Sequence, residues 1–380
     1  MQLTSTIPSL LLASLLLLCS SSVQAADCQQ TTDIEHENCT IAGTGLRMND
    51  LQAVGSHNSY KLAIPAPELS RIRAYNERSA ITLDYSHLPL TEQLDLGMRQ
   101  IELDVVYDPE GGRFADPLLP REAAAKPGAQ AYDPAQMQTP GFKVLHSQDI
   151  DVRSNCMTWI LCLTEIRTWS RANPKHVPIL IMLNAKEGGS TFPGVEPALD
   201  FSEAAYSALD AETLSVFSWH EIITPDLVRG HHPTLREAVL QDNWPSLDDA
   251  RGKVLFALDE SPEKVRTYVR DRASLQGLPM FVNSIDTGAD HAAYFTINDP
   301  QAAFDRIQAA VIQGFIVRTR ADANTLEARQ NSTARREAAF ASGAQYISTD
   351  YYVPRLDFSS YQVRLPNDNA ARCNPVRCAP

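Results

Sequence analysis

Short runs of apolar and β-branched residues recur along this chain, and few of them alternate with polar positions. Such runs are typical of strands that are buried on both faces of a parallel sheet. Residues that favour turns bound most of them. We predict eight such strands, namely Leu51–Val54, Gln100–Val106, Phe142–Leu145, Ile179–Leu183, Val254–Leu258, Met280–Val282, Phe315–Val317 and Tyr346–Ser348.

Between several of these runs the apolar residues follow helical spacing. Leu163, Ile166 and Trp169 are each separated by one helical turn, and residues 89–94, 300–312 and 325–341 also have helical patterns. Eight strands with helical connections indicate an α/β fold, a single irregular (β/α)8 TIM-type barrel.

One long segment interrupts this alternation. Residues 107–141 contain six prolines and four glycines and have no helical period, so we predict a long loop. Loops of this length in compact domains are usually functional or disordered.

The two ends of the chain differ from the barrel. An apolar segment from Ser9 to Leu18 precedes a small-residue site at Val23-Gln24-Ala25, which predicts a signal peptide at residues 1–25. We therefore expect a secreted or periplasmic protein with an N-terminal extension at 26–50, the barrel at 51–353 and a C-terminal tail at 354–380. The net charge of −13 argues against nucleic-acid binding, which needs a basic face.

The cysteines indicate disulfide bonds. Of the seven, Cys19 falls in the predicted signal peptide, which leaves six in an exported chain. Pairs of near neighbours close the smallest loops, so we predict the bonds Cys28–Cys39, Cys156–Cys162 and Cys373–Cys378 and regard the terminal extensions as stapled. The alternative, a zinc site, lacks the CxxC and HxxxH spacings typical of zinc ligands.

Charged or titratable side chains follow seven of the eight predicted strands. Barrel enzymes carry their chemistry at this end of the strands. The side chains are His57 and Asn58, Glu102 and Asp104, His146, Asn184 with Lys186 and Glu187, Asp259 and Glu260, Arg318 and Arg320, and Asp350.

Two of these groups suggest a particular chemistry. Glu102 and Asp104 share one face of a strand, and carboxylates inside a barrel need a ligand or a partner. Two imidazoles can move protons near neutral pH, while amide and carboxylate oxygens can hold a hard cation. Such a set of residues suits the cleavage of a phosphodiester.

The same residues resemble a known family. Ser56-His57-Asn58-Ser59-Tyr60, Glu102-Leu103-Asp104 and His146 follow the order found in phosphatidylinositol-specific phospholipase C barrels. The exported bacterial, calcium-dependent branch is the most similar, and the runs at residues 314–322 and 348–351 support this likeness. The resemblance covers roughly residues 51–353.

The resemblance implies roles for five of the residues. His57 and His146 would flank the phosphate as the catalytic pair. Asn58, Glu102 and Asp104 would bind Ca²⁺, which prefers oxygen ligands. Either carboxylate could also act as a base.

Four further residues are candidates for metal or substrate contacts. Animal members of the family place a metal-binding glutamate after the fourth strand, where this chain has Asn184. Its carbonyl oxygen can still bind the metal, and Glu187 is the alternative ligand. Lys186 is expected to contact phosphate or inositol oxygens, while Arg318 either contacts the substrate or forms a salt bridge with a nearby aspartate.

We therefore expect a calcium-dependent phospholipase C that acts on phosphatidylinositol at a membrane or micelle surface. Attack by the inositol 2-hydroxyl would release diacylglycerol and form a cyclic inositol phosphate. One alternative is a glycerophosphodiester phosphodiesterase, but that family opens with His-Arg-Gly, which His57-Asn58-Ser59 does not match. Another is a non-catalytic barrel that binds inositol or lipid headgroups, which the presence of both histidines disfavours.

Overall fold

The computed structural model describes residues 40–41 and 44–378. The predicted signal peptide, part of the predicted extension at 26–50 and the predicted Cys28–Cys39 bond lie outside the described residues. No helix in the described part of the chain is both long and apolar enough to cross a bilayer.

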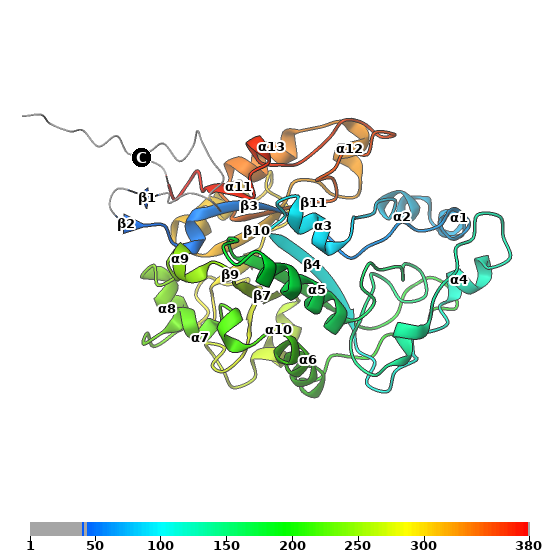
Figure 1. Ribbon diagram of the computed structural model, residues 1–380, viewed down its shortest axis with the longest axis horizontal. Helices are drawn as coiled ribbons and strands as arrows, with labels where there is room; N and C mark the ends of the chain where they lie inside the picture. The colour runs from blue at the N-terminus through cyan, green and yellow to red at the C-terminus, as the bar shows by residue number, and fades with distance from the viewer. Residues whose placement is uncertain (1–39, 42–43, 379–380) are drawn as a thin grey trace, which may run out of the picture.

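A ring of parallel strands forms the centre of the molecule (Figure 1). These strands are β3 (Leu51–Ser56), β4 (Gln100–Val106), β6 (Ile179–Lys186), β7 (Val254–Leu258), β8 (Met280–Val282), β9 (Tyr294–Thr296), β10 (Ile316–Arg320) and β11 (Tyr346–Thr349). Their order is β8-β7-β6-β4-β3-β11-β10-β9. A parallel bridge between Asn283 and Tyr294 joins the two outer strands. The nearly closed ring confirms the predicted (β/α)8 barrel.

One predicted barrel strand is wrong and one was missed. The run Phe142–Leu145 contains β5 (Lys143–Val144), which pairs antiparallel with the end of β4 and lies outside the ring. The place of a barrel strand is taken by β9, which pairs in parallel with β10. An apolar run reveals burial but not strand direction, and the three residues of β9 are too few to show a pattern.

Helices connect most of the strands. They are α1 (Ala66–Tyr75), α2 (Glu77–Thr82), α3 (Leu90–Asp95), α4 (Leu118–Ala123), α5 (Trp159–Ala172), α6 (Glu203–Val216), α7 (Pro225–Arg229), α8 (Leu235–Leu240), α9 (Leu247–Ala250), α10 (Pro262–Val269), α11 (Phe304–Ile312), α12 (Leu326–Gln330) and α13 (Ala334–Ala341). Figure 1 shows α1, α2 and α4 grouped on the side towards which β4 points.

One predicted helix and one predicted loop need correction. The predicted helix at 325–341 is broken into α12 and α13, because Asn331 adopts a left-handed conformation with φ of 49°. The predicted loop at 107–141 contains α4 and a 3-10 turn at Ala135–Gln138.

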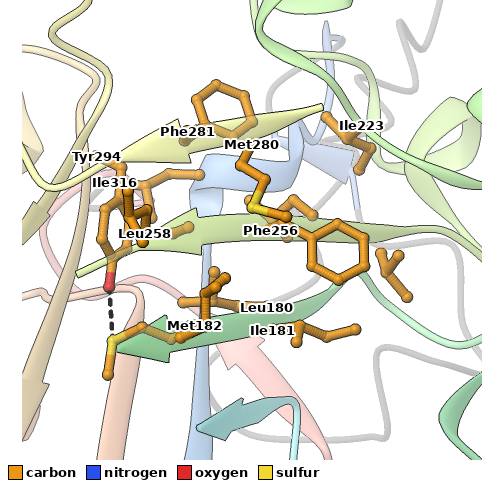
Figure 2. Packing of buried hydrophobic residues seen from close by; sticks show 14 of the residues in the cluster. Leu180, Ile181, Met182, Ile223, Phe256, Leu258, Met280, Phe281, Tyr294 and Ile316 are labelled. Carbon is orange, nitrogen blue, oxygen red and sulfur yellow. Dashed lines mark hydrogen bonds between the residues drawn. The ribbon is translucent and has the colours of Figure 1, made fainter. Parts of the chain in front are cut away.

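The apolar core fills the barrel and the space between its strands and helices. Met182, Phe256, Leu258 and Met280 are fully buried, and Figure 2 shows several of the core side chains packed together. The Tyr294 hydroxyl donates to the Met182 sulfur at 3.1 Å. Since β6 and β9 are not neighbours in the sheet, this contact crosses the barrel interior.

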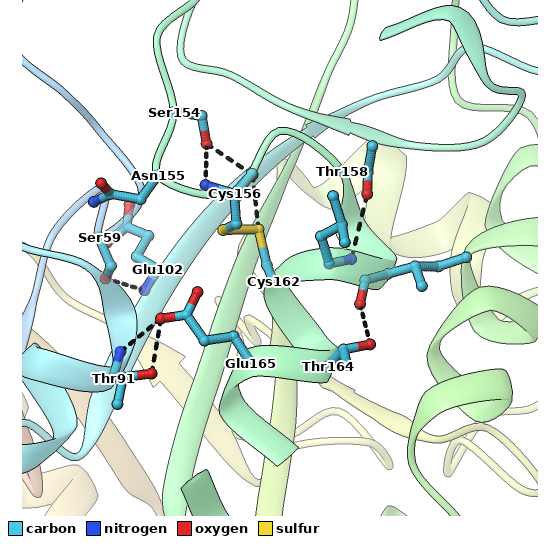
Figure 3. The surroundings of a disulfide bond; sticks show 12 residues. Ser59, Thr91, Glu102, Ser154, Asn155, Cys156, Thr158, Cys162, Thr164 and Glu165 are labelled. Atoms are coloured by element: carbon cyan, nitrogen blue, oxygen red, sulfur yellow. Dashed lines mark hydrogen bonds between the residues drawn. A yellow bond between two sulfur atoms is a disulfide. The ribbon is translucent and has the colours of Figure 1, made fainter. Parts of the chain in front are cut away.

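The structure confirms one predicted disulfide. Cys156 and Cys162 are bonded, which ties the loop before α5 to the first turn of that helix (Figure 3). The predicted Cys373–Cys378 bond is wrong. Cys373 is buried in β12 (Ala371–Cys373), which pairs antiparallel with β3, whereas the Cys378 thiol donates to the carbonyl of Asp50 at 3.2 Å.

Candidate active site

Strand register determines which polar side chains point into the barrel. Asp104 on β4 pairs with Asn184 on β6, and Glu102 pairs with Met182. Paired residues on neighbouring strands point to one face, as do residues two apart on the same strand. Met182 faces the interior, so Glu102, Asp104 and Asn184 point inwards too, and the spacing of the two acids predicted their shared face.

The segment that follows His57 is hydrogen-bonded to β4 at Glu102 and Asp104. The amide of Ser59 donates to the carbonyl of Glu102 at 2.9 Å, and the amide of Glu102 donates to the Ser59 hydroxyl at 2.8 Å (Figure 3). The Tyr60 hydroxyl donates to Asp104 Oδ2 at 2.9 Å. Residues 58–60 are thereby held next to both acids.

Close packing of β3 against β4 requires a glycine in β3. A Cβ atom on Gly55 would lie 2.3 Å from the Cβ of Gln100 and 2.4 Å from its carbonyl oxygen. The absence of a side chain at Gly55 therefore lets β3 approach β4 and brings His57, two residues later, to the barrel mouth.

His57 is held by a carboxylate and faces two arginines. Its Nδ1 lies 2.9 Å from Asp350 Oδ1, and its Nε2 lies 3.2 Å from Arg320 and 3.8 Å from Glu102 Oε1. Burial, followed by the positive charges of Arg320 and Arg318, lowers the pKa of His57 well below its ordinary value. The ring is therefore neutral near neutral pH, with Nδ1–H donating to Asp350 and a lone pair on Nε2.

His146 has a matching carboxylate. Its Nδ1 lies 3.0 Å from Asp151 Oδ2, and the buried ammonium of Lys61 lies 3.3 Å from the same oxygen. Burial alone would raise the pKa of Asp151, but Lys61 and His146 outweigh it and lower the pKa. The Lys61 ammonium also lies 4.8 Å from the centroid of the Tyr85 ring, and that ring stacks on His57, so both histidines belong to one connected cluster.

Asn58 follows the histidine and has an unusual backbone conformation. Its φ is 48°, in the left-handed region that asparagine tolerates better than most residues. Its amide nitrogen donates to the Tyr85 hydroxyl at 2.7 Å, whereas its buried Oδ1 has no hydrogen-bond partner among the described residues. Tyr85 also stacks on His57, with ring centroids 5.9 Å apart.

Each of the two inward-facing acids is paired with a cation. Arg318 binds Glu102 and also donates to Asn298. Lys186 Nζ lies 3.1 Å from Asp104 Oδ2, while the other oxygen of Asp104 is buried and has no partner within the described part of the chain. Burial raises the pKa of Glu102 to about 7 despite the opposing charge of Arg318.

These residues fit a calcium site. Asn58 Oδ1 and Asp104 Oδ1 are buried oxygens that hydrogen bonds leave unsatisfied, which is costly unless a ligand binds there. Ca²⁺ prefers hard oxygen ligands of this kind. No cluster of three or more His, Cys, Asp or Glu side chains that could hold a metal occurs in the described ranges, so the fit depends on the asparagine oxygens.

The structure separates the two candidates for the remaining metal ligand. Asn184 donates its amide nitrogen to the carbonyl of Asp259, and its side chain lies beside Asp104. Glu187 instead accepts from the amide of Phe201 at 2.9 Å and pairs with Lys264 at 3.4 Å. This arrangement favours Asn184.

Several supporting residues of the site had no role predicted from the sequence. Asp350 and Arg320 were noted at strand ends, but their pairing with His57 was not predicted. Lys61, Tyr85 and Asp151 were missed entirely. The one available signal was Asp151, an acid five residues after a candidate catalytic histidine.

Comparisons with known proteins identify the family of the chain and relatives of its fold. The family model described as "Phosphoinositide phospholipase C, Ca2+-dependent" matches residues 46–375. A calcium-dependent phosphoinositol-specific phospholipase C from Pseudomonas sp shares the fold at 16% identity and a TM-score of 0.51, over 87% of this chain and 96% of that chain. The enzyme from Streptomyces antibioticus does so at 17% identity and a TM-score of 0.50, over 81% and 95%. No curated protein matches the chain.

Proposed function

We propose that this chain, which belongs to the Ca²⁺-dependent phosphoinositide phospholipase C family, cleaves the phosphodiester bond of phosphatidylinositol. The products would be diacylglycerol and an inositol phosphate formed through a cyclic intermediate. The observation that carries the proposal is a pair of histidines at one barrel mouth, each bound through Nδ1 to a buried carboxylate.

The surroundings of the two histidines support different roles. A neutral His57 can take the proton of the inositol 2-hydroxyl on Nε2, where the hydroxyl would replace Arg320. Asp350 keeps the ring in the required tautomer and stabilises the imidazolium that forms. The carboxylate of Asp151, 3.0 Å from Nδ1 of His146, would stabilise positive charge on that ring, which suits a role in protonating the leaving diacylglycerol oxygen.

Asn58, Glu102, Asp104 and Asn184 are the proposed ligands of Ca²⁺, through their side-chain oxygens. The bound cation would lower the pKa of the attacking hydroxyl and neutralise charge on the phosphate. Glu102 offers Oε1, because Arg318 binds Oε2.

Two cationic residues were expected to bind the substrate. Lys186 lies at the end of β6 with a partly exposed side chain, so it remains our candidate for a phosphate contact. Arg318 is almost fully buried and binds Glu102 and Asn298. We therefore propose that Arg318 acts by holding Glu102.

The substrate class requires contact with a lipid surface. Leu88, Val353 and Leu356 are exposed apolar side chains in two loops beside the site, and Leu356 is 78% exposed. The amide of Leu88 donates to the Tyr352 hydroxyl at 2.9 Å, which joins these loops. We propose that the enzyme docks peripherally on the lipid surface through these side chains. We also propose that it is exported, on the basis of the composition of residues 1–25.

The test is hydrolysis of phosphatidylinositol micelles with Ca²⁺ and with chelator. We expect turnover that needs Ca²⁺ and that His57→Ala reduces by roughly 10²-fold or more with the fold intact by circular dichroism. His220→Ala, an exposed histidine, is the matched control. Retained turnover in His57→Ala would refute the mechanism, and a wild-type protein that binds headgroups without turnover would favour a non-catalytic barrel.

A further inference from the structure

We propose that Lys186 is a displaceable counter-ion, which occupies Asp104 until Ca²⁺ binds and is then released towards the phosphate of the substrate. The inference rests on the proposed function and extends it to the order of events at the same site. It follows from a difference between the two cations that bind the two inward-facing acids.

Arg318 is fixed and Lys186 can move. The side chain of Arg318 is 1% exposed and is held by both Glu102 and Asn298. The side chain of Lys186 is 35% exposed, and its ammonium meets Asp104 at the open end of the barrel. A lysine is a flexible point charge, whereas an arginine that binds two partners is held by its planar geometry.

Asp104 needs a cation at all times. Its side chain is fully buried, and one oxygen already accepts from Tyr60 while the other has no partner in the described structure. A buried carboxylate without compensation is strongly destabilising. Lys186 supplies that compensation through Oδ2, and a divalent ion that also contacts Oδ1 and Asn58 can replace it with a net gain of charge and contacts.

The exchange couples metal binding to substrate binding. While Lys186 is paired with Asp104, its charge is not available to an anionic headgroup. Once Ca²⁺ occupies Asp104, the ammonium can bind the phosphate. By linkage, the headgroup must then strengthen Ca²⁺ binding by the same factor by which Ca²⁺ strengthens headgroup binding.

The direct test is chemical labelling of lysine amines by reductive methylation, read by mass spectrometry. We expect the labelling rate of Lys186 to rise several-fold when Ca²⁺ is added to the enzyme without substrate. Lys175 is exposed and precedes β6 at the opposite end of the barrel, so it is the internal control and should not change. Unchanged or slower labelling of Lys186 in saturating Ca²⁺ would overturn the inference.

The second test is calorimetric titration of Ca²⁺ into purified variants. Lys186→Met should bind Ca²⁺ about five- to tenfold more tightly than the wild type, the range expected from losing one partly exposed competing charge. Lys175→Met should match the wild type. Equal or weaker binding by Lys186→Met would refute the exchange.

A final measurement examines the coupling with inositol 1-phosphate as the probe. In the wild type Ca²⁺ should strengthen its binding, and in Lys186→Met most of that strengthening should disappear. Coupling that persists in the variant would assign the effect to Ca²⁺ alone and overturn the release step. If calcium exchange is observed but phosphatidylinositol is not cleaved, the inference stands while the proposed function fails.

Discussion

The buried ion pair between Lys61 and Asp151 makes a quantitative prediction about stability and activity. Both side chains are fully buried, with Nζ and Oδ2 at 3.3 Å. Lys61 also donates to the carbonyls of Leu62 and Tyr85, at 3.3 and 3.2 Å. Lys61→Met leaves a buried carboxylate, and Asp151→Asn leaves a buried ammonium, so we expect each to cost about 3–5 kcal/mol.

The double variant distinguishes the cost of leaving one buried charge unpaired from the cost of losing the hydrogen bonds of Lys61. Lys61→Met with Asp151→Asn removes both charges, and the asparagine oxygen can still accept from His146. We expect the double variant to cost about 2 kcal/mol, well below the sum of the single changes. The loss that remains comes from the two carbonyls that lose the lysine donor.

The assay is urea unfolding of the wild type and the three variants, followed by tryptophan fluorescence. The exposed pair Asp116 and Arg121, with oxygen and nitrogen 2.6 Å apart, provides a control cycle in which we expect almost no coupling. A double variant of Lys61 and Asp151 that is destabilised by the sum of the singles would refute the reasoning.

Activity of the same double variant tests the role of Asp151. Asparagine keeps the orientation of the His146 ring but cannot stabilise its positive charge. We expect turnover to fall by about 10- to 100-fold in a protein that is still folded. Unchanged turnover would show that His146 does not need a charged partner.

Two further predictions concern pH and packing. Burial raises the pKa of Asp210 to about 7, above its ordinary value, so its contribution to stability is present at low pH and is lost as the pH rises through 7. Asp210→Asn should therefore stabilise the protein by at most about 4 kcal/mol at pH 8 but not near pH 3, as measured by thermal unfolding. The exposed Asp271→Asn is the control and should have no effect. An equal gain in stability at both pH values would contradict this prediction. Gly55→Ala places a Cβ 2.3 Å from Gln100 and should lower the free energy of unfolding in urea by about 2 kcal/mol or more. In Gly45→Ala the new Cβ meets no described atom within 4 Å, so this control should be nearly neutral. Equal effects of the two substitutions would refute the packing argument.

Local patterns were sufficient to predict which acids face the barrel interior. The spacing of Glu102 and Asp104 placed both on one face of β4, and the register with β6 shows the same side chains pointing inwards. Burial of both strand faces predicted most of the barrel in the same way. Strand burial and the face on which a side chain lies depend on residues that are close in sequence, so both can be predicted from the sequence.

Strand direction could not be read from local patterns. The run that contains β5 is as apolar as a barrel strand, yet it pairs antiparallel with Val105 and Val106 of β4. His146 therefore lies in a loop between two barrel strands and not at the end of one. The resemblance to a family placed this histidine in the site, because that comparison depends on the order of motifs and not on strand assignment.

Sequence reasoning predicted that the acids inside the barrel need a partner, but not which base pairs with which acid. A buried carboxylate must have a cation or another ligand nearby, so the number of acids at the barrel mouth sets a requirement for bases. Within the described structure, four of these acids are paired with a base, Asp151 with Lys61, Glu102 with Arg318, Asp350 with Arg320, and Asp104 with Lys186. Which base serves which acid depends on contacts between residues up to 216 positions apart, as for Glu102 and Arg318. The cation of the last pair is the most exposed of the four, so the position where a metal ion can replace a side chain at least cost is Asp104.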